Sequence, residues 1–214
     1  MNILVIESSG RCITAALRCA EGFFEMVIDA GFRHAETLMP GVNRLMEMAA
    51  LAPDAVDLTA CSAGPGSFTA LRIGMATAKG IARGAGCAFK AVPTLPLLAA
   101  GREHWPGIVM PVMDARKKRV YTAAFRRGER IRDDADISLE AFLAGLPPGE
   151  AVLATGPDAE MCEGTAGVTV DPLCASGRGR AMVSMAREAY EREGGDAGDL
   201  GPLYLRPSEA ELEA

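Results

Sequence analysis

The fold is decided by one stretch, which reads Ala63-Gly64-Pro65-Gly66-Ser67-Phe68-Thr69-Ala70-Leu71-Arg72-Ile73-Gly74. An apolar, strand-like run precedes it, and Ser67 is a suitable N-cap for a helix predicted over Phe68–Arg83. The glycines allow a sharp turn, and the start of a helix offers free N–H groups to an anion such as phosphate. A tight strand-to-helix turn needs the same residues without any ligand, and the P-loop pattern is absent. Both interpretations stay open.

Elements predicted around this stretch alternate between short apolar runs and amphipathic segments. Three consecutive strands are expected first, and a helix follows them over Ala35–Leu51. After the helix that starts at Phe68 come another strand and a short helix. The expected strands are Ile3–Ile6, Ile13–Leu17, Phe23–Ile28, Leu58–Ala63 and Cys87–Val92, and the short helix is Pro93–Ala100.

The same order recurs in the second half of the chain. Glu7 closes the first strand of the chain, and Asp114 closes the strand predicted over Ile108–Met113. With one residue inserted, Thr14-Ala15-Ala16-Leu17 aligns with Thr122-Ala123-Ala124-Phe125. Such an internal repeat predicts a duplicated architecture, although two unrelated hairpins can also look alike. The remaining predictions are strands at Val120–Phe125, Arg130–Ile137, Ala151–Thr155 and Val168–Val170, helices at Ser138–Gly145 and Gly179–Glu193, a flexible link at Glu193–Asp199, a docked tail at Gly201–Pro207 and a frayed end at Ser208–Ala214.

Composition excludes several classes of protein. The chain has 214 residues, 49% of them apolar, and a net charge of −6, which argues against disorder and against coating nucleic acid or a membrane by net charge. No apolar run approaches the roughly 18 residues of a membrane span, and the N-terminus has no basic region typical of a signal peptide. The chain has six cysteines, none of them in a CxxC pair, and only two histidines. This composition argues against a zinc site. We therefore expect a cytoplasmic protein with reduced, buried cysteines.

The glycine stretch, followed by Ala76-Thr77-Ala78-Lys79-Gly80, resembles the hallmark of the TsaB/YeaZ family. Four other segments are similar to family motifs, namely Ile3–Ser9, His34–Pro40, Pro111–Tyr121 and Tyr204-Leu205-Arg206. The family supplies the partner subunit in bacterial synthesis of threonylcarbamoyladenosine in tRNA. The resemblance implies an α/β fold of the actin/sugar-kinase/Hsp70-like type with two related lobes. We expect residues 1–103 to form the first lobe, with a tail from about residue 200 docking back onto it, and residues 104–199 to form the second.

The resemblance also bears on chemistry. It implies a weak nucleotide site at Glu7, Gly64, Gly66, Ser67 and Thr69, but Glu7 and Ala70 depart from the usual aspartate and glycine. The catalytic relative binds a metal through paired histidines on a helix, whereas here Leu38 stands four residues after His34. We therefore expect no catalytic residue, metal or cofactor. The alternative is an independent enzyme, either a kinase-like phosphotransferase that uses Glu7, Gly64–Thr69 and Asp114 or a peptidase, although Ser67 does not lie in a GxSxG motif.

Partners follow from the same resemblance. They are a TsaD-type catalytic subunit, a TsaE-type ATPase subunit and a second copy of the chain. Predicted interface residues come from two helices and are His34, Glu36, Leu38, Met39, Arg72, Met75 and Lys79, with Met46, Met48 and Ala78 as further members of an apolar patch. These apolar side chains could equally face their own sheet. The basic run Arg116-Lys117-Lys118-Arg119 is either a contact for tRNA phosphates, reached through the complex, or a solvated hairpin tip.

Overall fold

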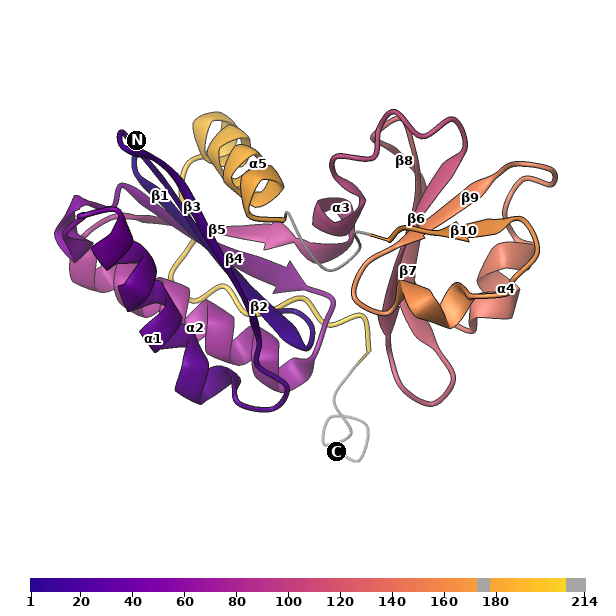
Figure 1. Cartoon of the computed structure of the whole chain (residues 1–214), viewed down its shortest axis with the longest axis horizontal. Coiled ribbons are helices and arrows are strands. Elements are labelled where there is room, and N and C mark those ends of the chain that lie inside the picture. Colours follow the sequence, from indigo (N-terminus) through magenta and orange to yellow (C-terminus); the bar gives the residue numbers. More distant parts are fainter. Residues whose placement is uncertain (173–177, 207–214) are drawn as a thin grey trace. The chain divides into compact units, whose positions relative to one another are not determined.

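The computed structural model describes residues 1–172 and 178–206. These residues divide into two compact units, one built from residues 1–97 with 178–202 and one from residues 98–172 with 203–206 (Figure 1). Each unit contains one five-stranded sheet. None of the helices in the described residues is long and apolar enough to cross a membrane.

The first unit is a sheet covered on both faces. Its strands are β1 (Ile3–Glu7), β2 (Cys12–Cys19), β3 (Gly22–Asp29), β4 (Leu58–Gly64) and β5 (Ala88–Pro93), in the order β3-β2-β1-β4-β5. β2 runs antiparallel to β1 and β3, whereas β4 and β5 run parallel to β1. Helices α1 (His34–Met48) and α2 (Phe68–Ala85) lie on one face, and α5 (Arg178–Glu193) lies on the other (Figure 1).

Alternation along β1 explains this layering. Leu4 and Ile6 point into the core beneath α1 and α2, while Ile3 and Val5 point into a second core beneath α5. Successive side chains of a strand face opposite sides of the sheet, so a strand that is apolar throughout is covered on both faces. Two short elements also occur in this part of the chain, the 3₁₀ turn Pro53–Ala55 and the helix α3 (Thr94–Ala99). The boundary between the two units falls within α3, after Leu97.

The second unit repeats the first. Its strands are β6 (Ile108–Asp114), β7 (Val120–Arg126), β8 (Glu129–Ile137), β9 (Val152–Thr155) and β10 (Val168–Val170), with α4 (Leu139–Ala144) and a 3₁₀ turn at Ala159–Cys162. The order β10-β9-β6-β7-β8, counted from β8, reproduces that of the first sheet. The duplicated α/β architecture is therefore confirmed.

Strand pairing corrects the alignment of the repeat. Glu7 lies opposite Thr14, whereas Asp114 lies opposite Val120. If the two acids correspond, the counterpart of Thr14 is Val120 and not Thr122. The two-residue difference escaped sequence comparison because it leaves every side chain on the same face of the strand.

The boundaries of the two lobes also differ from those expected. The predicted second lobe included the helix at residues 179–193, but Met182, Val183 and Ala186 of α5 pack against β1 and β2 of the first unit. The tail was expected on the first lobe, and residues 200–202 do belong to the first unit, where Lys79 donates to the Leu200 carbonyl. The residues after them belong to the second unit, where the Arg206 guanidinium donates to the Asp136 carboxylate at 2.6 and 2.8 Å. Cys174 and the predicted frayed end lie outside the described residues.

Candidate functional site

The glycine stretch allows the start of α2 to pack closely against the turn between β1 and β2. Ser67 occupies the N-cap position, but its side chain makes no capping hydrogen bond. Its backbone N–H instead donates to the Ser9 carbonyl at 2.7 Å. A Cβ atom on Gly66 would lie 2.6 Å from that carbonyl oxygen, so only glycine permits this approach.

A second close approach follows nearly two turns into the helix. A Cβ atom on Gly74 would lie 2.0 Å from the Ser8 hydroxyl, which donates to the Ala70 carbonyl at 3.0 Å. Gly64 donates its N–H to the Thr94 hydroxyl at 3.1 Å. The glycines of the hallmark therefore have packing roles within the first unit, which is the ligand-free interpretation of the stretch.

The acid at the end of β1 is buried and paired. Glu7 has no solvent exposure, and its Oε1 accepts from the Ser9 N–H at 2.7 Å. Its Oε2 accepts from the Arg178 guanidinium at 3.1 Å, and the side chain of Arg178 is only 6% exposed. A carboxylate held in this way by an internal cation is poorly placed to bind a metal ion or activate a nucleophile.

The structure thus brings Glu7, Gly66 and Ser67 together around Ser9, while Thr69 is exposed on the first turn of α2. Sequence reasoning missed Arg178, because it lies 171 residues from Glu7 and belongs to no motif. The N–H of the next residue, Gly179, donates to the Glu25 carboxylate at 2.8 Å, which fixes the start of α5 on β3.

The peptidase alternative needs an activated serine, a metal site or an ionised thiol. His34 is buried, and its Nε2 is 2.9 Å from the Gly10 carbonyl. Across residues 1–172 and 178–206, no serine hydroxyl is hydrogen-bonded to a histidine and no cluster of three metal-ligating side chains occurs. Burial raises the pKa of the Cys61 thiol to about 12 and that of Cys162 to about 11, so both are protonated at neutral pH.

Three of the predicted interface residues are core residues. His34, Leu38 and Met75 are buried, and the further candidates Met46 and Ala78 are buried with them. The reason is helical spacing. Leu38 shares a face with Val42 and Leu45, and this face packs on the sheet. For Leu38, Met46, Met75 and Ala78, the interpretation in which they face their own sheet therefore holds, and the prediction of His34, Leu38 and Met75 as accessible interface residues is wrong.

The other members are accessible to different degrees. Glu36 and Arg72 are exposed, and the side chains of Met39 and Met48 are 41% and 49% exposed. Lys79 is half-buried, and its ammonium donates to the Gly198 carbonyl at 2.9 Å. Lys79 therefore holds the segment after α5 rather than standing as a free rim charge.

The outer face of α2 carries an unusual combination of side chains. Phe68 is 40% exposed, and the Arg72 guanidinium stacks 3.8 Å from its ring centre. Further along, Gly80 and Gly84 are exposed, and a Cβ atom on either would meet nothing within 4 Å. Each glycine costs the helix about 1 kcal/mol relative to alanine. The packing of the first unit does not require them, and glycines on a helix surface allow another backbone to approach closely.

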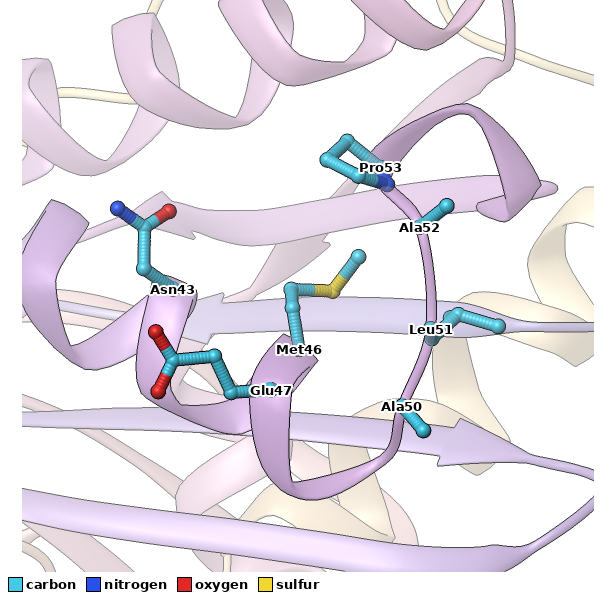
Figure 2. A pocket seen from close by; sticks show the side chains of 7 residues that line it. All are labelled: Asn43, Met46, Glu47, Ala50, Leu51, Ala52 and Pro53. Carbon is cyan, nitrogen blue, oxygen red and sulfur yellow. The ribbon is translucent and has the colours of Figure 1, made fainter.

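A hollow of about 430 Å³ lies at the C-terminal end of α1 (Figure 2). Met46 stands between the helix and the loop that follows it, and the carboxylate of Glu47 lies at the rim, paired with Arg44 at 3.1 Å. The lining residues are Asn43, Met46, Glu47, Ala50, Leu51, Ala52 and Pro53. By helical spacing, Met39 shares the side of α1 that carries Asn43 and Met46, whereas Met48, nine residues further on, lies about 180° around the helix. We call the side of α1 with Met39 and the outer face of α2 together the α1–α2 face.

The predicted tRNA contact lies in the turn between β6 and β7. Arg116, Lys117 and Lys118 are exposed and all adopt left-handed backbone conformations, with φ of 62°, 53° and 59°. Part of the charge is neutralised locally, because Arg116 pairs with Asp114 at 3.1 Å and Arg119 pairs with Asp136 at 2.7 Å. Lys117 and Lys118 are exposed, which makes them accessible to a phosphate backbone.

Comparison with known proteins places these features in a family. Residues 29–151 match the family described as TsaD, tRNA N6-adenosine threonylcarbamoyltransferase. The chain is 31% identical, over its whole length and 97% of the relative, to the tRNA threonylcarbamoyladenosine biosynthesis protein TsaB of Bacillus subtilis.

Solved structures agree. YeaZ from Pseudomonas aeruginosa is 26% identical with a TM-score of 0.79, covering 95% of this chain and 99% of that one. A second Pseudomonas aeruginosa structure, described as similar to peptidase YeaZ, is 25% identical with a TM-score of 0.80, covering 96% and 99%. With the full-length match to TsaB and the shared fold, the chain belongs to the TsaB/YeaZ family.

Proposed function

We propose that this protein is a cytoplasmic, non-catalytic subunit of the machinery that makes threonylcarbamoyladenosine in tRNA. In this role it binds and activates the TsaD-type subunit, which transfers the threonylcarbamoyl group to adenosine 37. The family relationship supports the process. The α1–α2 face supports the proposed binding to a partner, because it exposes Met39 on α1 and Phe68 on α2 and carries two helix glycines that the first unit does not use.

The state of Glu7 supports a role without catalysis. A phosphotransferase needs a carboxylate free to hold a metal ion or to accept a proton. Glu7 instead accepts hydrogen bonds from Ser9 and Arg178 inside the first unit. Two features of the first unit therefore support the proposal most directly. They are the buried Glu7 carboxylate, which is paired with Arg178, and the exposed α1–α2 face.

The same face serves a second copy of the chain when the catalytic subunit is absent. A shared face makes the two associations mutually exclusive, so the catalytic subunit dissociates the homodimer. The TsaE-type ATPase subunit joins the assembled complex. tRNA is contacted only in that complex, with Lys117 and Lys118 contributing to the phosphate contacts.

A matched pair of methionines tests the α1–α2 face. Met39 on α1 and Met161 in the second unit have 41% and 42% exposure. Burying a methionine side chain contributes about 1.5–3 kcal/mol, so a charge at a buried contact lowers affinity at least tenfold. We expect Met39→Glu to weaken binding of the TsaD-type subunit by that factor in calorimetric titration, with Met161→Glu binding as wild type does. Equal affinities of both variants and wild type would refute the assignment.

A further inference from the structure

The segment that follows α5 passes around the edge of the first sheet. α5 packs on the face that holds Ile3 and Val5, whereas the ammonium of Lys79 on α2, which covers the opposite face, donates to the Gly198 carbonyl. We call residues 194–200 the strap. The sequence predicted a flexible link over Glu193–Asp199, but the contacts of the strap show that it is held in place.

Asp196 takes the place of a neighbouring strand. β5 is the edge strand of the sheet, with β4 on its inner side. On the outer side, the Asp196 N–H donates to the Phe89 carbonyl at 2.8 Å, and the Ala91 N–H donates to the Asp196 carboxylate at 2.7 Å. An edge strand leaves such backbone groups open to pairing with another chain, and the strap occupies them.

Lys90 makes this edge selective for acidic segments. Its side chain is 6% exposed, and its ammonium donates to Asp196 at 2.8 Å, Glu193 at 3.0 Å and the Gly194 carbonyl at 3.3 Å. Burial opposes the charged form, but the hydrogen bonds from Lys90 to Asp196 and Glu193 outweigh it and raise the pKa of Lys90. Glu193 belongs to α5 and stays beside Lys90 when the strap leaves, so a replacing segment that brings a carboxylate restores the second of the two ion pairs of this buried ammonium.

We propose that the β5 edge and Lys90 form a docking site for an extended acidic segment of a partner protein, and that the strap is its intramolecular occupant. Strand addition would supply the backbone hydrogen bonds, and the carboxylate that meets Lys90 would supply the selectivity. Because the strap is covalently attached beside its site, its effective concentration is of the order of millimolar. A partner segment therefore displaces it only when the strap is loosened or when the partner is held nearby by other contacts.

The strap sequence itself is the probe. A labelled peptide of residues 193–202 carries the native contacts, and the same peptide with Asp196→Ala lacks the central carboxylate. The full-length protein is compared as wild type, as Asp196→Ala, which loosens the strap, and as Asp199→Ala. Asp199 is an exposed acid of the same strap and makes a matched control. Fluorescence anisotropy measures binding of the peptide.

We expect the native peptide to bind the Asp196→Ala protein at least tenfold more tightly than it binds wild type or the Asp199→Ala protein. The substituted peptide should bind none of them. Equal binding of the native peptide to all three proteins, or equal binding of both peptides to the loosened protein, would overturn the proposal. If Asp196→Ala lowers the melting temperature, Asp196→Asn replaces it, since the amide keeps an acceptor for the Ala91 N–H but lacks the charge. We expect Met39→Glu to leave binding of the peptide unchanged. This result would distinguish the proposed docking site at the β5 edge from the α1–α2 face.

Discussion

Replacing Arg178 by methionine tests whether Glu7 is a structural acid. The two side chains are 6% and 1% exposed and their charged groups lie 3.1 Å apart. Methionine has about the length of the aliphatic part of arginine but carries no charge. In the variant the buried Glu7 carboxylate keeps its hydrogen bonds from Ser9 but loses its ion pair with Arg178. Removing one partner of a buried ion pair costs about 3–5 kcal/mol. Even the lower figure is roughly a hundredfold change in the ratio of folded to unfolded protein.

The assay is urea denaturation followed by far-ultraviolet circular dichroism. Arg11→Met is the matched control, because Arg11 pairs with Asp29 at 2.8 Å while both side chains are more than half exposed. Such exposed pairs contribute little to stability, so we expect its midpoint to match wild type. The double variant Glu7→Gln with Arg178→Met should recover part of the loss, since no buried charge remains. If Arg178→Met were as stable as Arg11→Met, Glu7 would not depend on this pair and the argument against catalysis would fail.

Four further results follow from the same geometry. Met75→Glu should destabilise the first unit by about 3 kcal/mol or more, because Met75 is buried in the core, and thermal unfolding measures it; a fold as stable as wild type would place Met75 at the surface. Gly80→Ala should raise the free energy of unfolding by about 1 kcal/mol while weakening association with the TsaD-type subunit, and unchanged association would show that the face does not pack closely. Burial opposes ionisation of Asp136, but Arg206 and Arg119 outweigh it and lower its pKa, so its stabilising contribution is present above about pH 4 and is lost as the pH falls further. The fluorescence of Trp105, the single tryptophan and a residue of the second unit, reports this loss, and a pH profile identical in Asp136→Asn would contradict it. Lys117→Glu with Lys118→Glu should weaken tRNA binding by the assembled complex in a salt-dependent way, and unchanged binding across a salt series would remove these residues from the contact.

Most elements of the fold could be predicted from periodicity. The strand that ends at Glu7 and the helix that begins at Phe68 lie where the apolar patterns and the glycine turn put them. The repeat was visible because both halves begin with an apolar strand closed by an acid. Placement of α5 was not visible, because an amphipathic helix shows that it covers a sheet but not which of two sheets it covers.

The candidate site was predicted less well, for physical reasons. Leu38 and Met39 are neighbours in sequence, yet the first is buried and the second is exposed. Successive residues of a helix are 100° apart around its axis, so one can be buried while the next is exposed. A motif that contains both residues therefore does not show which of them can contact a partner. The pairing of Glu7 with Arg178 and of Lys90 with Asp196 joins residues more than 100 positions apart. Local sequence carries no signal for such pairs.

The most direct test of the account is the yield of threonylcarbamoyladenosine when tRNA and an activated threonylcarbamoyl donor are supplied to the TsaD-type subunit and the ATPase subunit, with or without this chain. We predict no modified tRNA from the chain alone, product when all three proteins are present, and a yield with Met39→Glu far below that with Met161→Glu at equal concentrations. Product formed at the same rate without the chain, or formed by the chain without the TsaD-type subunit, would contradict the central claim that it is an accessory subunit acting through the α1–α2 face.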